Sequence, residues 1–195
     1  MDVELPLFPL SSVLFPGGNL ALRIFEPRYL DLVRRCGRTG EGFGICLLKE
    51  GGEVGVARAT ATIGTEATII DFAMTDEGLL AITVHGGRRF EILRTRVQPD
   101  GLVVGTVRWL HEAPPSLLRS EHHLLSLLLA RVMDKAGIDH EGAGKGDLAD
   151  AAWVGWRLAE WLPLTAADRQ RRLELDDADA RLQSLVERLP DFQAD

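Results

Sequence analysis

The sequence predicts an α+β protein, in which a mixed β-barrel is followed by a C-terminal α-helical bundle. Up to residue 112 the apolar runs are short, rich in Val, Ile, Leu and Thr, and separated by Gly and Pro, a pattern typical of strands and turns. After residue 115 the apolar residues recur at the spacing of a helix face. We therefore expect a barrel domain over residues 1–112 and a helical domain over residues 116–195.

Seven segments have the length and composition of strands. They are residues 5–10, 20–24, 43–48, 67–72, 79–85, 89–96 and 102–110. Turn-forming residues separate several of them, as at Pro16-Gly17-Gly18, Asp76-Glu77-Gly78 and Gly86-Gly87. So many short strands with so few helices favour a closed or nearly closed barrel, which leaves few strand edges exposed.

One helix is expected to interrupt the strands, from Pro27 to about Gly37. Proline suits a first helical turn because its missing N–H would have no partner there, and glycine commonly ends a helix.

The C-terminal half is expected to be helical throughout. An apolar stripe runs from Leu117 through Leu124 to Met133 and stops near Gly137. A second helix should start at Asp147, a good N-cap, and end near Trp161. A capping-box pattern at Thr165 and Asp168 precedes a last helix. That helix carries Leu182, Leu185, Val186 and Leu189 on one face and ends at Pro190.

The composition is that of an ordinary globular protein, with 46% hydrophobic and 26% charged residues. The net charge of −7 is uneven: residues 1–110 hold 12 basic and 13 acidic side chains, whereas residues 111–195 hold 10 and 16. An acidic half disfavours general nucleic-acid binding. Neither a secretion signal nor a membrane span is predicted, so we expect a cytoplasmic protein. The two cysteines form no paired framework and are expected to be buried free thiols.

Three blocks follow one another near the N-terminus. They are Leu5-Pro6-Leu7-Phe8-Pro9-Leu10, Val13-Leu14-Phe15-Pro16-Gly17 and Leu22-Arg23-Ile24-Phe25-Glu26-Pro27-Arg28-Tyr29. Together they resemble the opening signature of the Lon protease N-terminal (substrate-binding) domain family, which is also similar to the N-terminal part of cereblon. The resemblance covers almost the whole chain, although Ala21 stands where members often have proline. It implies a PUA-like β-barrel followed by a helical bundle, a role in recognising polypeptide, and no chemistry of its own.

Two groups of residues are candidates for polypeptide binding, and each also has a purely structural interpretation. The first group surrounds Pro27, where a strand is expected to end and a helix to begin, and consists of Phe25, Glu26, Arg28 and Tyr29. These residues either define this joint, with Phe25 packed on Tyr29, or contact a ligand. Trp153 and Trp156 share a helix face, where they either fill a core or grip apolar side chains of a bound polypeptide.

A local basic group consists of Arg88, Arg89, Arg94 and Arg96. It is either a solvated strand face or an RNA-binding patch. The second interpretation rests on the resemblance to PUA-like barrels, some of which bind RNA, and the acidity of the chain argues against it.

No catalytic or metal-binding pattern is present. The segment Gly142-Ala143-Gly144-Lys145-Gly146-Asp147 lacks the first glycine and the Ser or Thr of a phosphate-binding loop. No serine stands with a lysine in the setting of a nucleophile, and the five histidines have no zinc-ligand spacing. We expect no enzyme activity, no cofactor and no metal.

The leading hypothesis is a non-catalytic polypeptide-recognition or adaptor module that lacks the ATPase and peptidase domains of a Lon protease. It would bind unfolded or extended polypeptide, through an apolar patch or by strand addition, alone or together with a protease or chaperone. The alternative is a PUA-like RNA-binding protein that uses the arginine group.

Overall fold

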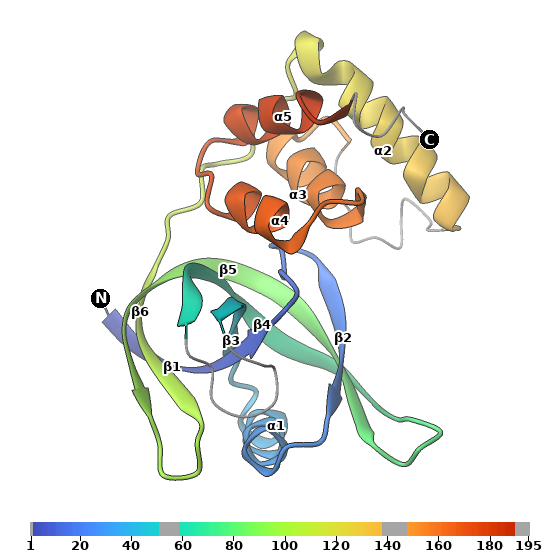
Figure 1. Cartoon of the computed structure of the whole chain (residues 1–195). Helices are drawn as coiled ribbons and strands as arrows, with labels where there is room; N and C mark the ends of the chain where they lie inside the picture. The colour runs from blue at the N-terminus through green and yellow to red at the C-terminus, as the bar shows by residue number, and fades with distance from the viewer. Residues whose placement is uncertain (1, 51–58, 138–147, 190–195) are drawn as a thin grey trace. The chain divides into compact units, whose positions relative to one another are not determined.

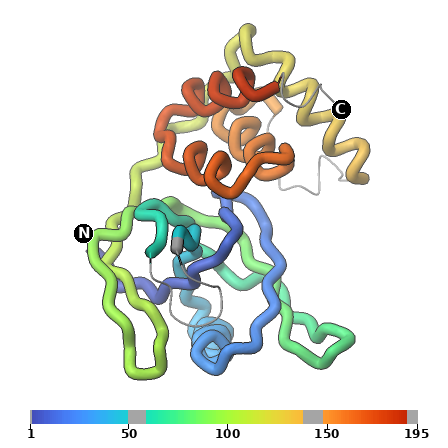
Figure 2. Tube along the Cα trace, viewed as in Figure 1, coloured from blue at the N-terminus to red at the C-terminus, as the bar shows by residue number. Residues whose placement is uncertain are grey.

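The computed structural model describes residues 2–50, 59–137 and 148–189, and the chain divides into two compact units, residues 1–111 and residues 112–195. Figures 1 and 2 show a first unit built mainly of strands and a second unit built of helices. The α+β class predicted from the change of periodicity is confirmed.

The described part of the first unit has six strands and one helix. They are β1 (Asp2–Leu10), β2 (Asn19–Ile24), α1 (Pro27–Thr39), β3 (Phe43–Glu50), β4 (Ala59–Met74), β5 (Leu80–Val97) and β6 (Val103–Trp109). The sheet is mixed, because β1 pairs in parallel with β3 and the other pairs are antiparallel. Five strands pair in a closed ring, in the order β5-β4-β3-β1-β6 and back to β5, and β2 pairs with β5 outside this ring.

The length of β5 explains how the ring and the extra strand coexist. Its residues 80–85 pair with β2, its residues 90–97 pair with β6, and β4 pairs with it from Leu80 to Glu91. Because a strand has only two edges, β2 and β6 follow one another along the edge opposite β4. The end of the β4–β5 hairpin extends away from the ring (Figure 2).

The prediction of a turn at Gly86-Gly87 is wrong, since β5 runs through both residues without a break. The role of Gly86 is close backbone contact. The Gly86 N–H donates to the Gly18 carbonyl at 2.8 Å, and the Gly86 carbonyl accepts from the Gly17 N–H at 2.7 Å. A Cβ atom on Gly86 would lie 2.2 Å from the Phe15 carbonyl oxygen. Glycine here admits a neighbouring loop rather than reversing the chain.

Helix α1 starts at Pro27 as predicted but ends two residues beyond the expected terminator Gly37, at Thr39. Gly40 adopts a φ of 71° and its N–H donates to the Cys36 carbonyl at 2.8 Å, so it is the residue that closes the helix. The buried face of α1 (Tyr29, Leu32, Val33 and Cys36) packs in one core cluster with residues of the sheet such as Phe8, Phe43 and Ile82. A second cluster, centred on Leu7, Phe90 and Val107, joins β1, β5 and β6.

Both cysteines are buried free thiols, as expected. Burial raises the pKa of Cys46 to about 12 and also raises the pKa of Cys36. Because the thiolate is the reactive form, we expect neither thiol to react with a disulfide reagent in the native protein at pH 8 and both to react after unfolding in guanidinium chloride. Rapid labelling of either cysteine under native conditions, measured by absorbance, would contradict this burial.

The described part of the second unit has a short 3₁₀ helix (Ser120–His122) and four α-helices. These are α2 (His123–Ala136), α3 (Ala151–Trp161), α4 (Ala166–Leu173) and α5 (Ala178–Val186). Their core includes Leu125, Leu129, Met133, Val154, Leu158, Leu182 and Leu185. Side-chain caps start three of the helices: Asp150 accepts from the Trp153 N–H, Thr165 from the Asp168 N–H, and Asp177 from the Asp179 and Ala180 N–H groups.

Several predicted details of this unit are wrong. Leu117 precedes the helices and is 82% exposed, and Leu124 is 75% exposed, so neither belongs to the buried stripe. Residues 148–150 form a turn and an isolated bridge, so α3 starts later than predicted, with Asp150 as its N-cap; Asp147 itself lies outside the described residues. Two short helices, α4 and α5, follow Thr165, and the predicted end at Pro190 also lies outside the described residues. Gly137 does end α2, with a φ of 65°.

Candidate functional site

A hollow of about 380 Å³ beside β2 is the strongest candidate for a binding site in the first unit. Its lining is mostly apolar, and four polar or charged side chains lie among the apolar ones. The lining residues are Phe8, Leu10, Ser11, Ser12, Leu20, Ala21, Leu22, Arg23, Ile24, Phe25, Glu26 and Tyr29. They come from the end of β1 and the two residues after it, from β2, from the β2–α1 joint and from the start of α1. We call it the β2 hollow.

The joint between β2 and α1 forms one part of the β2 hollow. Glu26 is the N-cap residue, in an extended conformation, and its carboxylate pairs with the Arg28 guanidinium at 2.8 Å. Arg28 also donates to the Gly101 carbonyl at 3.0 Å, which fastens the joint to the loop before β6. Glu26 and Arg28 thus satisfy one another and hold the backbone of this corner.

The two aromatic residues of the joint have different roles. The Tyr29 ring is buried and stacks on Phe8, with the ring centroids 3.9 Å apart. Phe25 is 53% exposed. The predicted packing of Phe25 on Tyr29 is therefore not what buries Tyr29, and Phe25 keeps apolar surface that a bound molecule could cover.

Strand β2 supplies the other part of the β2 hollow and has a free edge. One edge pairs with β5, from Asn19 opposite His85 to Ile24 opposite Leu80. Within the residues that the structure describes, no other strand pairs with β2, and Figure 1 shows β2 at the margin of the sheet. An edge strand presents backbone N–H and C=O groups that an incoming strand can pair with.

Comparison with known proteins places this fold and signature in a family. The model of the ATP-dependent protease La (LON) substrate-binding domain matches residues 4–191. The chain belongs to the Lon substrate-binding domain family. The first block of the opening signature lies in β1, the second in the loop after it, and the third across the end of β2 and the start of α1. The first and third blocks contribute residues to the lining of the β2 hollow.

Two solved structures and one curated relative are similar to this chain. A Lon N-terminal domain protein from Xanthomonas campestris is 45% identical, with a TM-score of 0.80 over 95% of this chain and 98% of that chain. The N-terminal domain of a Mycobacterium avium complex Lon protease shares the fold, with a TM-score of 0.71 at 20% identity over 95% of this chain and 97% of that one. Cereblon from Xenopus tropicalis is 29% identical over 113 residues, which are 56% of this chain and 24% of cereblon. The match thus spans about a quarter of that relative's length.

The tryptophan pair of this Lon domain belongs to the helical unit. Trp156 is only 6% exposed, and the Arg181 guanidinium lies over its ring at 3.2 Å from the centroid. Trp153 is half-buried and packs against the helical core. These positions favour the interpretation that the two rings fill and seal the bundle.

The four arginines of the basic group are divided among different roles. Arg88 pairs with Glu66 at 3.2 Å and lies over the Trp109 ring, and Arg96 pairs with Glu4 at 2.9 Å. Arg89 is fully buried, whereas Arg94 is exposed. Three of these four guanidinium groups are thus paired with a carboxylate or buried within the protein, which weakens the case for a phosphate-binding patch.

A second hollow of the first unit, about 580 Å³, is more polar. Its lining includes the Glu4–Arg96 ion pair, Glu41 and Arg35. Apolar segments fit such a lining less well than they fit the β2 hollow.

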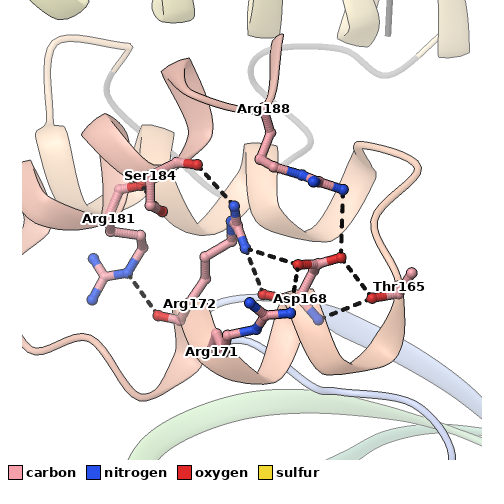
Figure 3. A network of polar contacts seen from close by, with 7 residues as sticks. All are labelled: Thr165, Asp168, Arg171, Arg172, Arg181, Ser184 and Arg188. Atoms are coloured by element: carbon pink, nitrogen blue, oxygen red, sulfur yellow. Dashed lines mark hydrogen bonds and ion pairs between the residues drawn. The ribbon is translucent and has the colours of Figure 1, made fainter. Parts of the chain in front are cut away.

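The helical unit contains a polar network of which the sequence predicted only the Thr165–Asp168 capping pair (Figure 3). The Asp168 carboxylate accepts from the Thr165 hydroxyl at 2.7 Å and pairs with Arg171 at 3.1 Å. Arg172 is buried and donates to the Asp168 and Ser184 carbonyls, both at 2.8 Å, which ties α4 to α5. The Thr165 hydrogen bond and the nearby arginines lower the pKa of Asp168.

The hollow beside this network is lined by equal numbers of arginines and carboxylates, so its charge favours neither anions nor cations. Its volume is about 580 Å³, and three arginines face three carboxylates. The charged lining residues are Arg171, Arg172, Arg188, Asp168, Glu174 and Glu187. We interpret the network as a structural clamp between α4 and α5.

Within residues 2–50, 59–137 and 148–189, no group of three or more His, Cys, Asp or Glu is arranged to hold a metal ion. None of the helices in the described part of the chain has the length and apolar character needed to cross a membrane. The glycine-rich segment Gly142–Asp147 lies outside the described residues.

Proposed function

We propose that this Lon substrate-binding domain is a non-catalytic polypeptide-recognition module that binds extended, apolar segments in the β2 hollow. It would act as an adaptor, by itself or in trans with a protease or chaperone. The observation that carries the proposal is the coincidence of a free strand edge with an apolar hollow beside it.

The two features complement one another in binding an extended chain. Backbone hydrogen bonds to β2 would provide affinity for any sequence, because every residue except proline offers an N–H and a C=O. The hollow would add selectivity, because it removes from water those side chains that face it. A module with both features would bind unfolded segments and leave folded proteins alone, since folded proteins have already paired their strands and buried their apolar residues.

The size of the hollow is consistent with this role. At about 380 Å³ it falls in the range of pockets that enclose small ligands, so a few side chains would fill it. The exposed ring of Phe25 at its rim offers apolar surface that binding would bury.

Replacing Phe25 with alanine tests the site. Burial of a phenylalanine ring is worth about 1.5–3 kcal/mol, and since Phe25 is already half-buried we expect about a tenfold loss of affinity. The measurement is fluorescence anisotropy of a labelled, permanently unfolded polypeptide whose cysteines have been carboxymethylated.

Phe72 provides a matched control, because it is also 53% exposed but lies on β4 and does not line the β2 hollow. Phe72→Ala should bind like the wild type. Equal losses for the two variants, or no loss for Phe25→Ala, would reject the β2 hollow as the site.

A labelled RNA measured in parallel at two salt concentrations distinguishes the proposal from nucleic-acid binding. Polypeptide binding by apolar burial should persist at high salt, whereas contacts to phosphates weaken steeply. Saturable RNA binding without polypeptide binding would reject the proposed function.

A further inference from the structure

We infer that the segment bound in the β2 hollow carries an acidic residue between two large apolar residues, in the pattern apolar–Asp/Glu–apolar. This inference rests on the proposed function and specifies the class of polypeptide that the site selects.

The first basis is the alternation of side chains along β2. Leu22 and Ile24 are 8% and 2% exposed and belong to the core, whereas Arg23 between them is exposed. A strand added to the free edge of β2 would have the same alternation, because successive side chains of a strand point to opposite faces. Residues i and i+2 of the added strand would therefore lie on the same face as Leu22 and Ile24, and residue i+1 would lie beside Arg23.

The second basis is the charge of the lining. Arg28 of the neighbouring β2–α1 joint does not line the hollow and is paired with Glu26; Arg34, farther along α1, is paired with Asp31 at 2.7 Å and does not line it either. Arg23 lines the β2 hollow, and among the described residues its guanidinium pairs with no carboxylate. Glu26 is the one acidic residue in the lining and is already paired. The unmatched charge at this edge is therefore positive, and an acidic residue in the bound strand would complement it.

The spacing distinguishes this pattern from a helical ligand. An amphipathic helix presents apolar residues at i, i+3 and i+4, whereas pairing along a strand edge requires i and i+2. A helix also uses its own backbone N–H groups and cannot donate them to β2. Spacing and backbone availability can therefore be tested separately from charge.

The experiment measures the affinity of the full chain for four labelled peptides by fluorescence anisotropy. The first contains Leu-Glu-Leu in an otherwise polar sequence, and the second has Lys in place of Glu. The third moves the two leucines to i and i+3, and the fourth is the first peptide with methylated backbone nitrogens at alternate positions. Each is measured with the wild type, with Arg23→Glu and with Arg34→Glu, an exposed control on α1.

The wild type should prefer the Glu peptide over the Lys peptide by about fivefold, as expected when an attractive cross-strand pair replaces a repulsive one. Arg23→Glu should reverse this preference, and Arg34→Glu should leave it unchanged. The peptide with i, i+3 spacing and the methylated peptide should bind more weakly than the first. The charge preference, but not the apolar contribution, should decline at high salt.

The outcomes separate this inference from the proposed function. If the wild type binds the peptides with no preference for charge, or Arg23→Glu changes nothing, the inference is overturned while polypeptide recognition stands. If no peptide binds and unfolded polypeptide does not bind either, the proposed function itself fails. Self-association through the β2 edge, seen as a dimer in sedimentation that peptide does not displace, would also overturn the inference. Circular dichroism confirms that each variant is folded.

Discussion

Replacing Gly86 with alanine is expected to lower the free energy of unfolding by about 3 kcal/mol, at the upper end of the range for overpacking a close-fitting site. The new Cβ would lie 2.2 Å from the Phe15 carbonyl oxygen, well inside contact distance. The obstacle is backbone, and it is held by the hydrogen bonds that join Gly86 to Gly17 and Gly18. Neither β5 nor the Phe15–Gly18 loop can therefore move away without losing these hydrogen bonds.

The neighbouring residue provides the control for this prediction. A Cβ on Gly87 would meet the Glu66 carboxylate at 3.2 Å, and that group lies at the end of a flexible side chain. Gly87→Ala should cost less than about 1 kcal/mol, as for ordinary surface changes. Urea unfolding followed by circular dichroism measures both values. Similar costs for the two variants would show that the Phe15–Gly18 loop does not press on β5.

Replacing Asp168 with asparagine is expected to lower the free energy of unfolding by about 2 kcal/mol at pH 7, a typical value for losing hydrogen bonds to a charged group. The amide keeps the size of the carboxylate but removes the charge that faces Arg171 and Arg172. Arg172 is buried, so its guanidinium charge would lose part of the opposite charge that offsets its removal from water.

The stability that the Asp168 carboxylate contributes should depend on pH. The Thr165 hydrogen bond and the arginines lower the folded pKa of Asp168 below its ordinary value of 3.8. A lowered carboxyl pKa contributes stability that is fully present above the unfolded pKa and is lost as pH falls through the folded pKa. The difference between wild type and Asp168→Asn should therefore be constant from pH 7 to about pH 5 and shrink below about pH 4.

Asp31→Asn is the control, because Asp31 forms an exposed ion pair with Arg34, with 69% of its side chain accessible. Exposed pairs contribute little, so this variant should unfold like the wild type throughout. If the difference in the free energy of unfolding between wild type and Asp168→Asn persists unchanged at pH 3, the Asp168 charge does not stabilise the clamp.

Local patterns in the sequence predicted the local features of the fold. The change of periodicity predicted strands before helices, and Pro27 and Gly137 marked helix ends correctly. The failures have a common cause. Gly86-Gly87 was interpreted as a turn because glycine has two uses, reversal and close approach, and the second depends on a loop 68 or 69 residues away in the chain. Gly37 was taken for a helix end, but the helix is covered there by Phe72 of β4.

The candidate site was predictable only in part, for the same reason. The signature drew attention to Phe25 and Tyr29, which line the β2 hollow. No pattern in the sequence assigned a binding role to the β2 residues Leu20, Leu22 and Arg23. Their position at a free edge depends on the order of strands in the sheet, and hydrophobic periodicity does not predict that order. Of the Asp168 network only the Thr165 cap was predictable, since Arg188 joins Arg171 and Arg172 only through the turn between α4 and α5.

The position of β2 outside the closed ring of strands has a consequence for how this fold can diversify. Changing an outward residue of β2, such as Asn19, Ala21 or Arg23, alters no pairing within the ring. The ring can therefore remain a constant frame while β2 acquires new side chains by ordinary mutation. A family built in this way would separate the residues that specify the fold from those that choose the ligand, and new specificities would carry little risk of misfolding.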